Sequence, residues 1–192
     1  MTQFDHRYEL EGLVATYENM PTQKRDEMTA DHQPQSKALK NVAKLSAFDN
    51  LFVQIVALPA EREQAPGGYC INVHQRRHEA GRTFGNKSKG DDGTLSLFNA
   101  NLAAKVQAAG PDVAAQRAAA IEALKEELHT DVQAMRVVAQ TSDSDPGVWG
   151  DIHALRLSNS GKARLIQKIR DQILAGEDRI LWQDFDRLTR PM

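Results

Sequence analysis

Short apolar runs separated by polar and turn-forming residues mark the first half of the chain. The alternating segment 8–15 predicts a strand, and the continuous apolar run 51–58 predicts a buried strand. Pro66-Gly67-Gly68 is a turn signal, so residues 69–73 are expected to return as the other strand of a hairpin. The pattern therefore predicts a small sheet in this half.

Helices, a loop and one further strand are predicted around these runs. Apolar residues at helical spacing, with lysines on the other side, predict a helix over 37–47. A short basic helix is expected after the hairpin, ended by Gly81 or Gly85. Glycine, lysine and aspartate dominate residues 85–93 and predict a loop there, and residues 94–98 predict one more short strand.

The second half is rich in alanine, glutamine and leucine and has the pattern of long helices. Pro111 suits the first turn of a helix. The apolar face that follows predicts a long helix and consists of Ile121, Leu124, Leu128, Val132 and Met135. The polar segment 141–150 contains glycine and proline and predicts a linker or an exposed loop.

A last helical region is expected near the end of the sequence. Ser158 or Ser160 could cap its start, and Gly176 is expected to break it. Its apolar residues recur at i, i+4 spacing: Leu165, Ile169 and Ile173. A closing apolar segment follows, made of Ile180, Trp182, Phe185 and Leu188.

These elements together predict an α+β protein. A small mixed-sheet core is expected over residues 1–98, and a mostly helical region over 99–192, packed on the core or appended to it. A chain of 192 residues fits one domain, or one small domain with an appendage.

Composition narrows the class of protein. One cysteine excludes a disulfide framework and a four-thiolate zinc site, and a net charge of −2 excludes a histone-like cation. The sequence has no uninterrupted apolar run of transmembrane length, so no membrane insertion is expected. Residues 1–6 have no basic head followed by an apolar run, so no signal peptide is predicted and a cytoplasmic location is expected.

The sequence feature most unlike the rest of the chain is the segment 74–89. It holds five Lys/Arg and one Glu, together with two histidines. Arg76 and Arg77 fall at a strand-to-helix junction, where guanidinium groups and unpaired helix N–H groups together can bind phosphate oxygens. The segment therefore predicts a phosphate or nucleotide cradle, and a solvated basic helix face is the alternative interpretation.

The spacing Cys70-x3-His74-x3-His78 suggests a metal site, and Cys70 could also be a nucleophile, but neither interpretation is favoured. If a strand ends and a helix begins between them, the three side chains do not share a face, and a fourth ligand has no recognisable spacing. Cys70 lies inside an apolar strand pattern, so the sequence predicts a small buried hydrophobe rather than an exposed thiolate.

The stretch from Gly67 to Ala80 resembles the signature of the ParB/sulfiredoxin superfamily, which is a hairpin turn, a strand beginning with tyrosine, and Gly-Glu-Arg-Arg-x-x-Ala opening a helix. Leu13-Val14 and Asn19-x-Pro21-x-Gln23-x-Arg25 resemble the first strand and loop of that family. The predicted helix and buried strand follow in the family's order, so the resemblance covers about residues 8–84.

Three departures from the family pattern limit what the resemblance implies. His74-Gln75 replaces the Gly-Glu that the ParB branch uses in nucleotide hydrolysis, which puts a ParB-like CTP switch in doubt. Cys70 precedes the position of the sulfiredoxin cysteine, so that activity is not expected. The downstream helix-turn-helix of centromere-binding ParB proteins is not recognisable, so centromere binding is not expected either.

The resemblance then implies a divergent ParB/sulfiredoxin-like core of the kind found in plasmid fertility-inhibition factors of the oncogenic suppression activity type. Such a protein is expected to bind nucleotide and DNA, to act as an ATPase or DNA nuclease, and to inhibit conjugative or type IV secretion transfer of DNA. ATP or another nucleotide and Mg²⁺ are the implied cofactors. DNA, bound by its backbone with little sequence preference, and a component of the transfer apparatus are the implied partners.

The residues expected to carry these functions follow from that hypothesis. His74 or Glu79 would serve as general base. Asp91 and Asp92 are candidates for holding Mg²⁺, with a solvated acid pair as the alternative. The expected phosphate ligands are Gln23, Arg25, Gln75, Arg76 and Arg77. The expected DNA-backbone contacts are Arg82, Lys87 and Lys89.

Two other hypotheses remain open at this point. The chain could be a non-catalytic module that docks on a transfer-apparatus protein through its helical half, with the apolar stripe 180–188 as the docking face. That stripe could instead pack on residues 113–138. A third interpretation is an unrelated α/β protein whose arginine pair is surface charge.

Overall fold

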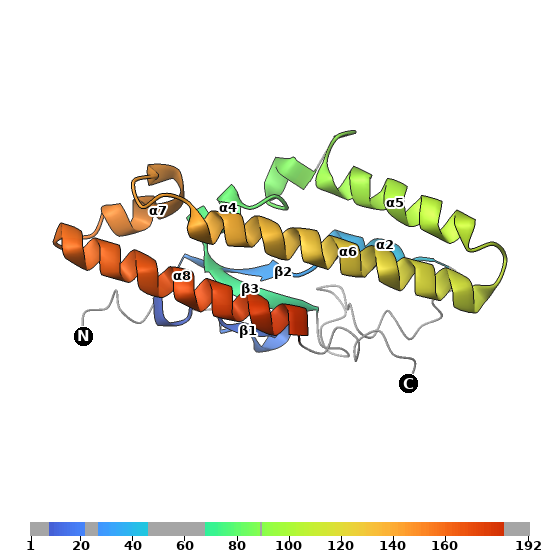
Figure 1. The fold of residues 1–192 in the computed structure, drawn as a ribbon, viewed down its shortest axis with the longest axis horizontal. Coiled ribbons are helices and arrows are strands. Elements are labelled where there is room, and N and C mark those ends of the chain that lie inside the picture. Colours follow the sequence, from blue (N-terminus) through green and yellow to red (C-terminus); the bar gives the residue numbers. More distant parts are fainter. Residues whose placement is uncertain (1–7, 22–26, 46–67, 89, 183–192) are drawn as a thin grey trace.

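The computed structural model describes residues 8–21, 27–45, 68–88 and 90–182, which form a small sheet beside a set of helices (Figure 1). The strands are β1 (Val14–Thr16), β2 (Met28–His32) and β3 (Tyr69–His74). The α-helices are α2 (Ser36–Ala43), α4 (Gln75–Ala80), α5 (Thr94–Ala108), α6 (Val113–Gln140), α7 (Pro146–His153) and α8 (Asn159–Trp182). Short 3₁₀ helices follow β1 (η1, Tyr17–Asn19) and α4 (η3, Gly85–Ser88).

The described strands form an antiparallel sheet in the order β1-β3-β2. β3 is the central strand, and its apolar sequence suits that position. The side chains of Cys70, Ile71 and Val73 are all fully buried. The predicted strand 69–73 is confirmed. The predicted strand 8–15 is confirmed only in part, because pairing as a strand begins at Val14. The predicted strand 51–58, and with it the hairpin, lies outside the described residues.

One hydrophobic core joins the sheet to the helical half of the chain. Helices α6 and α8 pack against each other, and α8 also packs against β1 and β3. Figure 1 shows α6 and α8 running side by side along the sheet. The core residues come from β3, α6, α7 and α8 and include Ile71, Val73, Val132, Met135, Trp149, Ile169 and Ile173. The described helical half is therefore packed on the sheet.

The predicted break of the last helix at Gly176 is wrong, because α8 continues through it to Trp182. A Cβ atom on Gly176 would lie 2.2 Å from the backbone oxygen of Gly12. The glycine is therefore needed for the close approach of α8 to the segment before β1. Ser158, by contrast, caps α8 as predicted, since its Oγ accepts a hydrogen bond from the N–H of Gly161 at 3.1 Å.

The segment predicted as an exposed loop over 141–150 contains most of helix α7 instead. Asp145 caps this helix by accepting a hydrogen bond from the N–H of Gly147 at 2.8 Å, and Pro146 occupies the first helical position. Trp149 is fully buried, and its Nε1 donates to the carbonyl of Thr141 at 3.3 Å. The polar Asp145-Pro146 pair, which is also typical of loops, is here the start of a helix.

Residues 94–98, predicted as a strand, form the first turns of α5. The boundary predicted between residues 98 and 99 therefore falls inside this helix. Phe98 and Leu102 of α5 pack on α2 and α6 in a second apolar cluster. The predicted long helix is confirmed as α6, but it begins at Val113 after an Asp112 cap, so Pro111 precedes the helix.

Two further predictions in the first half are confirmed. The helix expected over 37–47 is α2, and the short basic helix is α4, which ends at Gly81. The loop expected over 85–93 holds a single short 3₁₀ helix, η3, among turns. Among the described residues, no helix is both long and apolar enough to cross a membrane.

Candidate functional site

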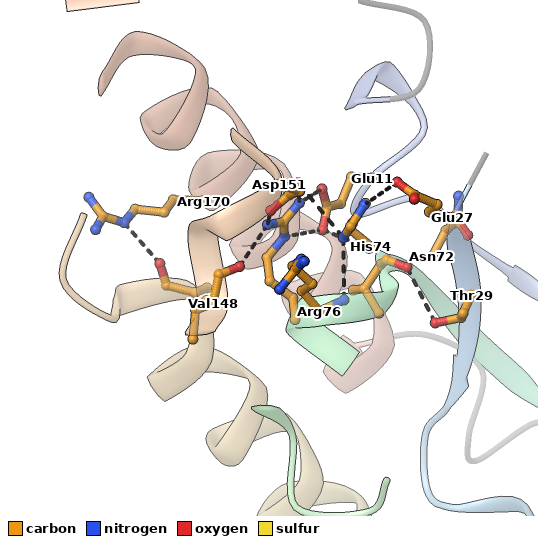
Figure 2. A network of polar contacts seen from close by, with 12 residues as sticks. Glu11, Glu27, Thr29, Asn72, His74, Arg76, Val148, Asp151 and Arg170 are labelled. Atoms are coloured by element: carbon orange, nitrogen blue, oxygen red, sulfur yellow. Dashed lines mark hydrogen bonds and ion pairs between the residues drawn. The ribbon is translucent and has the colours of Figure 1, made fainter. Parts of the chain in front are cut away.

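The junction between β3 and α4 brings the predicted site residues to the edge of the sheet. β3 ends at His74, and the side chain of His74 caps α4, because its Nδ1 accepts a hydrogen bond from the N–H of Arg76 at 3.3 Å. Figure 2 shows His74 between Glu27 and Asp151, with Glu11 and Arg76 close by. The junction is therefore a polar network built from four separate parts of the chain.

Arg77 lies at the centre of this network and is completely buried. Its Nε and Nη2 donate to the two carboxylate oxygens of Glu11 at 2.6 and 2.7 Å. Nη1 and Nη2 donate to the two oxygens of Asp151 at 2.9 and 3.1 Å, and Nη1 also donates to the carbonyl of Val148 at 3.1 Å. These bonds use all five guanidinium N–H groups.

Arg77 is consequently a structural tie between the sheet and α7. Burial opposes its charge, yet the carboxylates of Glu11 and Asp151 raise its pKa above the ordinary value. Burial likewise opposes ionisation of Asp151, but hydrogen bonds from Arg77 lower the pKa of that carboxyl. The ring of Trp149 lies 4.7 Å from the guanidinium carbon. The described arrangement leaves Arg77 no donor for a phosphate.

His74 is also committed to the protein interior. It is 2% exposed, its Nε2 lies 3.2 Å from Oε2 of Glu27, and its Nδ1 lies 3.7 Å from Oδ2 of Asp151. Both ring nitrogens are thus occupied, and the role of a general base toward a bound substrate does not fit this geometry. The exposed member of the pair is Glu27, which the sequence reasoning did not single out.

The remaining phosphate candidates are divided between the surface and the undescribed part of the chain. Gln75 and Arg76 are exposed at the start of α4, and the Arg76 guanidinium lies against Gly150 of α7. Gln75 donates to Glu79, the other candidate base, at 2.9 Å on the exposed face of α4. Gln23 and Arg25 lie outside the described residues.

The predicted DNA-binding residues are similarly engaged. Arg82 donates to Glu127 at 3.0 Å and also to Asp131, and these carboxylates raise its pKa although burial opposes the charge. Lys87 is exposed, and its Nζ donates to the carbonyls of Glu79 and Gly81 at 2.7 and 3.2 Å. Lys89 lies outside the described residues. Carboxylates from distant segments therefore pair with Arg77 and Arg82, two of the five Lys/Arg of the basic segment.

The structure also shows where the predicted metal-binding residues and the cysteine lie. Asp91 and Asp92 are exposed before α5. Within the described ranges, no group of three or more His, Cys, Asp or Glu residues is arranged to hold a metal ion. Cys70 is fully buried, as predicted, and burial raises the pKa of its thiol. Described candidates for an ATP and Mg²⁺ site are thus either tied to carboxylates or dispersed on the surface.

A cavity of about 610 Å³ lies apart from this junction, between α2, α5 and the start of α6. Apolar side chains, including Leu102 and Val106, are surrounded there by amides and Lys44. None of the predicted site residues lines it.

A second segment of the described chain also carries exposed positive charge. Residues 152–170 hold five Lys/Arg and no Asp or Glu. Arg170 pairs with Asp143, whereas no carboxylate of the described residues lies within ion-pair distance of the other four. We call these four the basic surface: Arg156, Lys162, Arg164 and Lys168. Arg156, Arg164 and Lys168 are exposed, and Lys162 donates to the carbonyl of His153 at 2.8 Å.

The basic surface lies at one end of the molecule. Arg164 and Lys168 are one helical turn apart on the solvent side of α8, and Arg156 precedes that helix. Figure 1 shows α7 and the first turns of α8 together at the left end of the view. No local signal in the sequence marks this segment, because its charges are spread over 19 residues and lack an adjacent pair.

Comparison of the chain with protein-family models, with curated proteins and with solved structures finds no match.

Proposed function

We propose that this protein binds the sugar–phosphate backbone of DNA through the basic surface at the α7–α8 end. The observation that carries the proposal is the run of 19 residues, 152–170, with five Lys/Arg and no acidic residue. Four of those cations have no carboxylate partner among the described residues. Exposed Lys and Arg side chains bind DNA phosphates and release their counterions, which favours association.

The distribution of charge along the second half supports this assignment. Residues 91–151 hold four Lys/Arg and ten Asp/Glu, so the positive segment follows a strongly negative one. The basic surface is expected to attract a polyanion to one end of the molecule, and the acidic residues elsewhere are expected to repel it. The N-terminus of α8, a helix of 24 residues, adds the positive end of its dipole there.

The contact is expected to be largely independent of base sequence. Flexible lysine and arginine side chains on one helix turn reach phosphates, whereas reading of bases needs an element inside a groove. The described fold presents the basic surface along the solvent side of α8, with Ile166, Ile169 and Ile173 of the same helix buried. Binding is therefore expected to weaken steeply with salt.

The ParB/sulfiredoxin resemblance also implies nucleotide binding, catalysis and a role in plasmid biology. A nucleotide cradle at α4 does not fit the described residues, since Arg77 has no free donor. No catalytic step is therefore proposed. A setting in plasmid biology, with DNA in conjugative or type IV secretion transfer as the target, remains the proposed context.

The test is a comparison of two charge-reversal variants in fluorescence anisotropy with a short labelled DNA duplex. Arg164→Glu/Lys168→Glu removes two cations of the basic surface, and Arg76→Glu/Lys87→Glu removes two exposed cations at α4 and η3. Each variant shifts the formal net charge from −2 to −6, so only the location differs.

The α8 variant is expected to lose on the order of tenfold or more in DNA affinity at moderate salt, and the α4 variant far less. Equal losses would mean that only net charge matters. A larger loss in the α4 variant would return the DNA site to the segment 74–89. Incubation with ATP and Mg²⁺ in the same buffers, with phosphate release as readout, separately tests the hydrolase hypothesis.

A further inference from the structure

Three buried carboxylates lie near one another, one on β2 and two on α6. We call them the acid cluster: Asp31 of β2, and Glu127 and Asp131 of α6. They are 4%, 7% and 3% exposed, respectively. Asp31 is close enough to Asp131 to disfavour its charge. The cluster lies outside the Arg77 network and outside the basic surface.

One guanidinium group faces these carboxylates. Arg82 donates to Glu127 and Asp131 from the segment after α4. Gln35, before α2, donates from its backbone N–H to Asp131 at 3.2 Å and from its side chain to Glu127 at 3.0 Å. These contacts join α6 to the segment between β2 and α2 and to the segment after α4.

Histidine and amide groups complete the surroundings on the side of β2. His78 of α4 has Nε2 3.3 Å from Asp31, and its Nδ1 lies 2.8 Å from the hydroxyl of Thr29. Gln33 donates to the other oxygen of Asp31 at 3.0 Å. His78 is therefore the second group that could supply positive charge to the cluster, and only when it is protonated.

The other helices packed on α6 bring their charges to different places. Lys105 of α5 pairs with Glu126, which is half exposed on another face of α6. Glu177 of α8 faces Arg136, more than one helical turn beyond Asp131. Among the described residues, Arg82 is thus the one Lys or Arg in ion-pair contact with the acid cluster.

The charges of the cluster do not balance if every carboxyl is ionised. Counted over the described residues, three carboxylates against one guanidinium leave an excess of negative charge in a buried place, which costs free energy unless a proton is retained. Burial raises the pKa of Asp131 to about 8, and the nearby Glu127 and Asp31 act in the same direction, although Arg82 opposes them.

We propose that the acid cluster is a proton-operated latch that holds α6 to the β2–α2 segment and to the segment after α4. With one proton retained, Asp131, Glu127 and Arg82 form a closed network with Gln35. Without it, repulsion between Asp131, Glu127 and Asp31 weakens the attachment of α6. The latch makes this contact strongest in acid solution, and its contribution declines as the pH rises to alkaline values.

The direction in which stability changes with pH follows from the pKa of Asp131. Its folded-state pKa lies above the unfolded value of about 3.9, so the folded protein binds this proton more tightly than the unfolded chain does. The folding equilibrium constant is expected to fall as the pH rises from about 4 toward 8, by up to about tenfold per pH unit from this group. The effect levels off above the folded-state pKa.

The test measures urea unfolding from pH 5 to pH 9 for the wild type and for Asp131→Asn. The amide keeps the shape of the side chain but cannot ionise. The folding equilibrium constant of the variant is therefore expected to fall less with rising pH than that of the wild type. Asp143→Asn, at an exposed aspartate that pairs with Arg170, is the matched control and is expected to keep the wild-type slope. A wild-type slope in Asp131→Asn would overturn the proposal.

Two further readouts distinguish a latch from a general loss of stability. Hydrogen exchange at the Gln35 amide, which donates to Asp131, is expected to lose protection above pH 8 before the β3 amides do. The ¹³C shift of the Asp131 carboxyl reports its protonation directly, even if Asp131→Asn fails to fold. An Asp131 carboxyl already ionised at pH 6 would overturn the proposal. Stabilisation of the wild type by Mg²⁺ at pH 9, absent from Asp131→Asn, would also overturn it, because a cation would then balance the charge.

Discussion

The chain has two basic segments of five Lys/Arg each, and the fold treats them in opposite ways. In 74–89, Arg77 and Arg82 each face two carboxylates that come from distant parts of the sequence. In 152–170, only Arg170 of the five has such a partner among the described residues. Two arginines of the first segment are therefore structural, whereas four of the five cations of the second have no carboxylate partner in the described part of the chain.

The comparison teaches that adjacent arginines are a poor guide to available charge. Arg77 follows a buried strand at the first turn of a helix, and its position forces the guanidinium into the interior. A buried cation must be paired, so acidic side chains from other segments surround it. Arg164 and Lys168 lie on the solvent side of a long helix, where nothing requires such partners.

The largest expected effect is that of Arg77→Met on stability. The change leaves Glu11 and Asp151 buried without their cation, which is expected to cost about 3–5 kcal/mol in the free energy of unfolding. Urea denaturation measures the loss, with Arg76→Met as the neighbouring control. A loss similar to that of the control would show that Arg77 does not tie α7 to the sheet.

A smaller loss is expected from Arg82→Met. This side chain is 21% exposed, so water can partly solvate Glu127 and Asp131 after its removal. The cost is expected to be about 1–3 kcal/mol at neutral pH. It should also steepen the loss of stability in alkaline solution, since the cluster would lack the one guanidinium that contacts it within the described ranges. An unchanged pH profile would contradict that account.

The smallest effect on stability is expected from Arg164→Ala. The side chain is exposed and has no carboxylate partner in the described part of the chain, so the free energy of unfolding should change by no more than about 0.5 kcal/mol. The same variant is nevertheless expected to bind DNA more weakly in the anisotropy assay. A clearly destabilised Arg164→Ala protein would show that this residue, like Arg77, stabilises the fold.

Local patterns predicted much of the described fold. The central strand β3, the helix α4 and the long helix α6 each follow from periodicity and end signals within a single segment. Helix α7 was missed although Asp145-Pro146 is an ordinary helix start. Gly176 was misread as a helix end, because its contact with Gly12 involves a residue far away in the sequence.

The site was less predictable, for a physical reason. Arg77 was identified as a significant residue, but its partners Glu11 and Asp151 lie 66 and 74 positions away and have no spacing that marks them. The same holds for Arg82 and the α6 carboxylates. Whether a cation is neutralised depends on tertiary packing, whereas its presence at a junction depends on local sequence alone.

The salt dependence of DNA binding tests the central claim most directly. For each phosphate contact removed, the slope of log K against log salt is expected to become shallower by about 0.9. Arg164→Glu/Lys168→Glu should therefore reduce the steepness of the wild-type slope by roughly 2, and Arg76→Glu/Lys87→Glu should leave it nearly unchanged. A slope changed only by the α4 variant, or by neither, would contradict the assignment of DNA binding to the basic surface of α8.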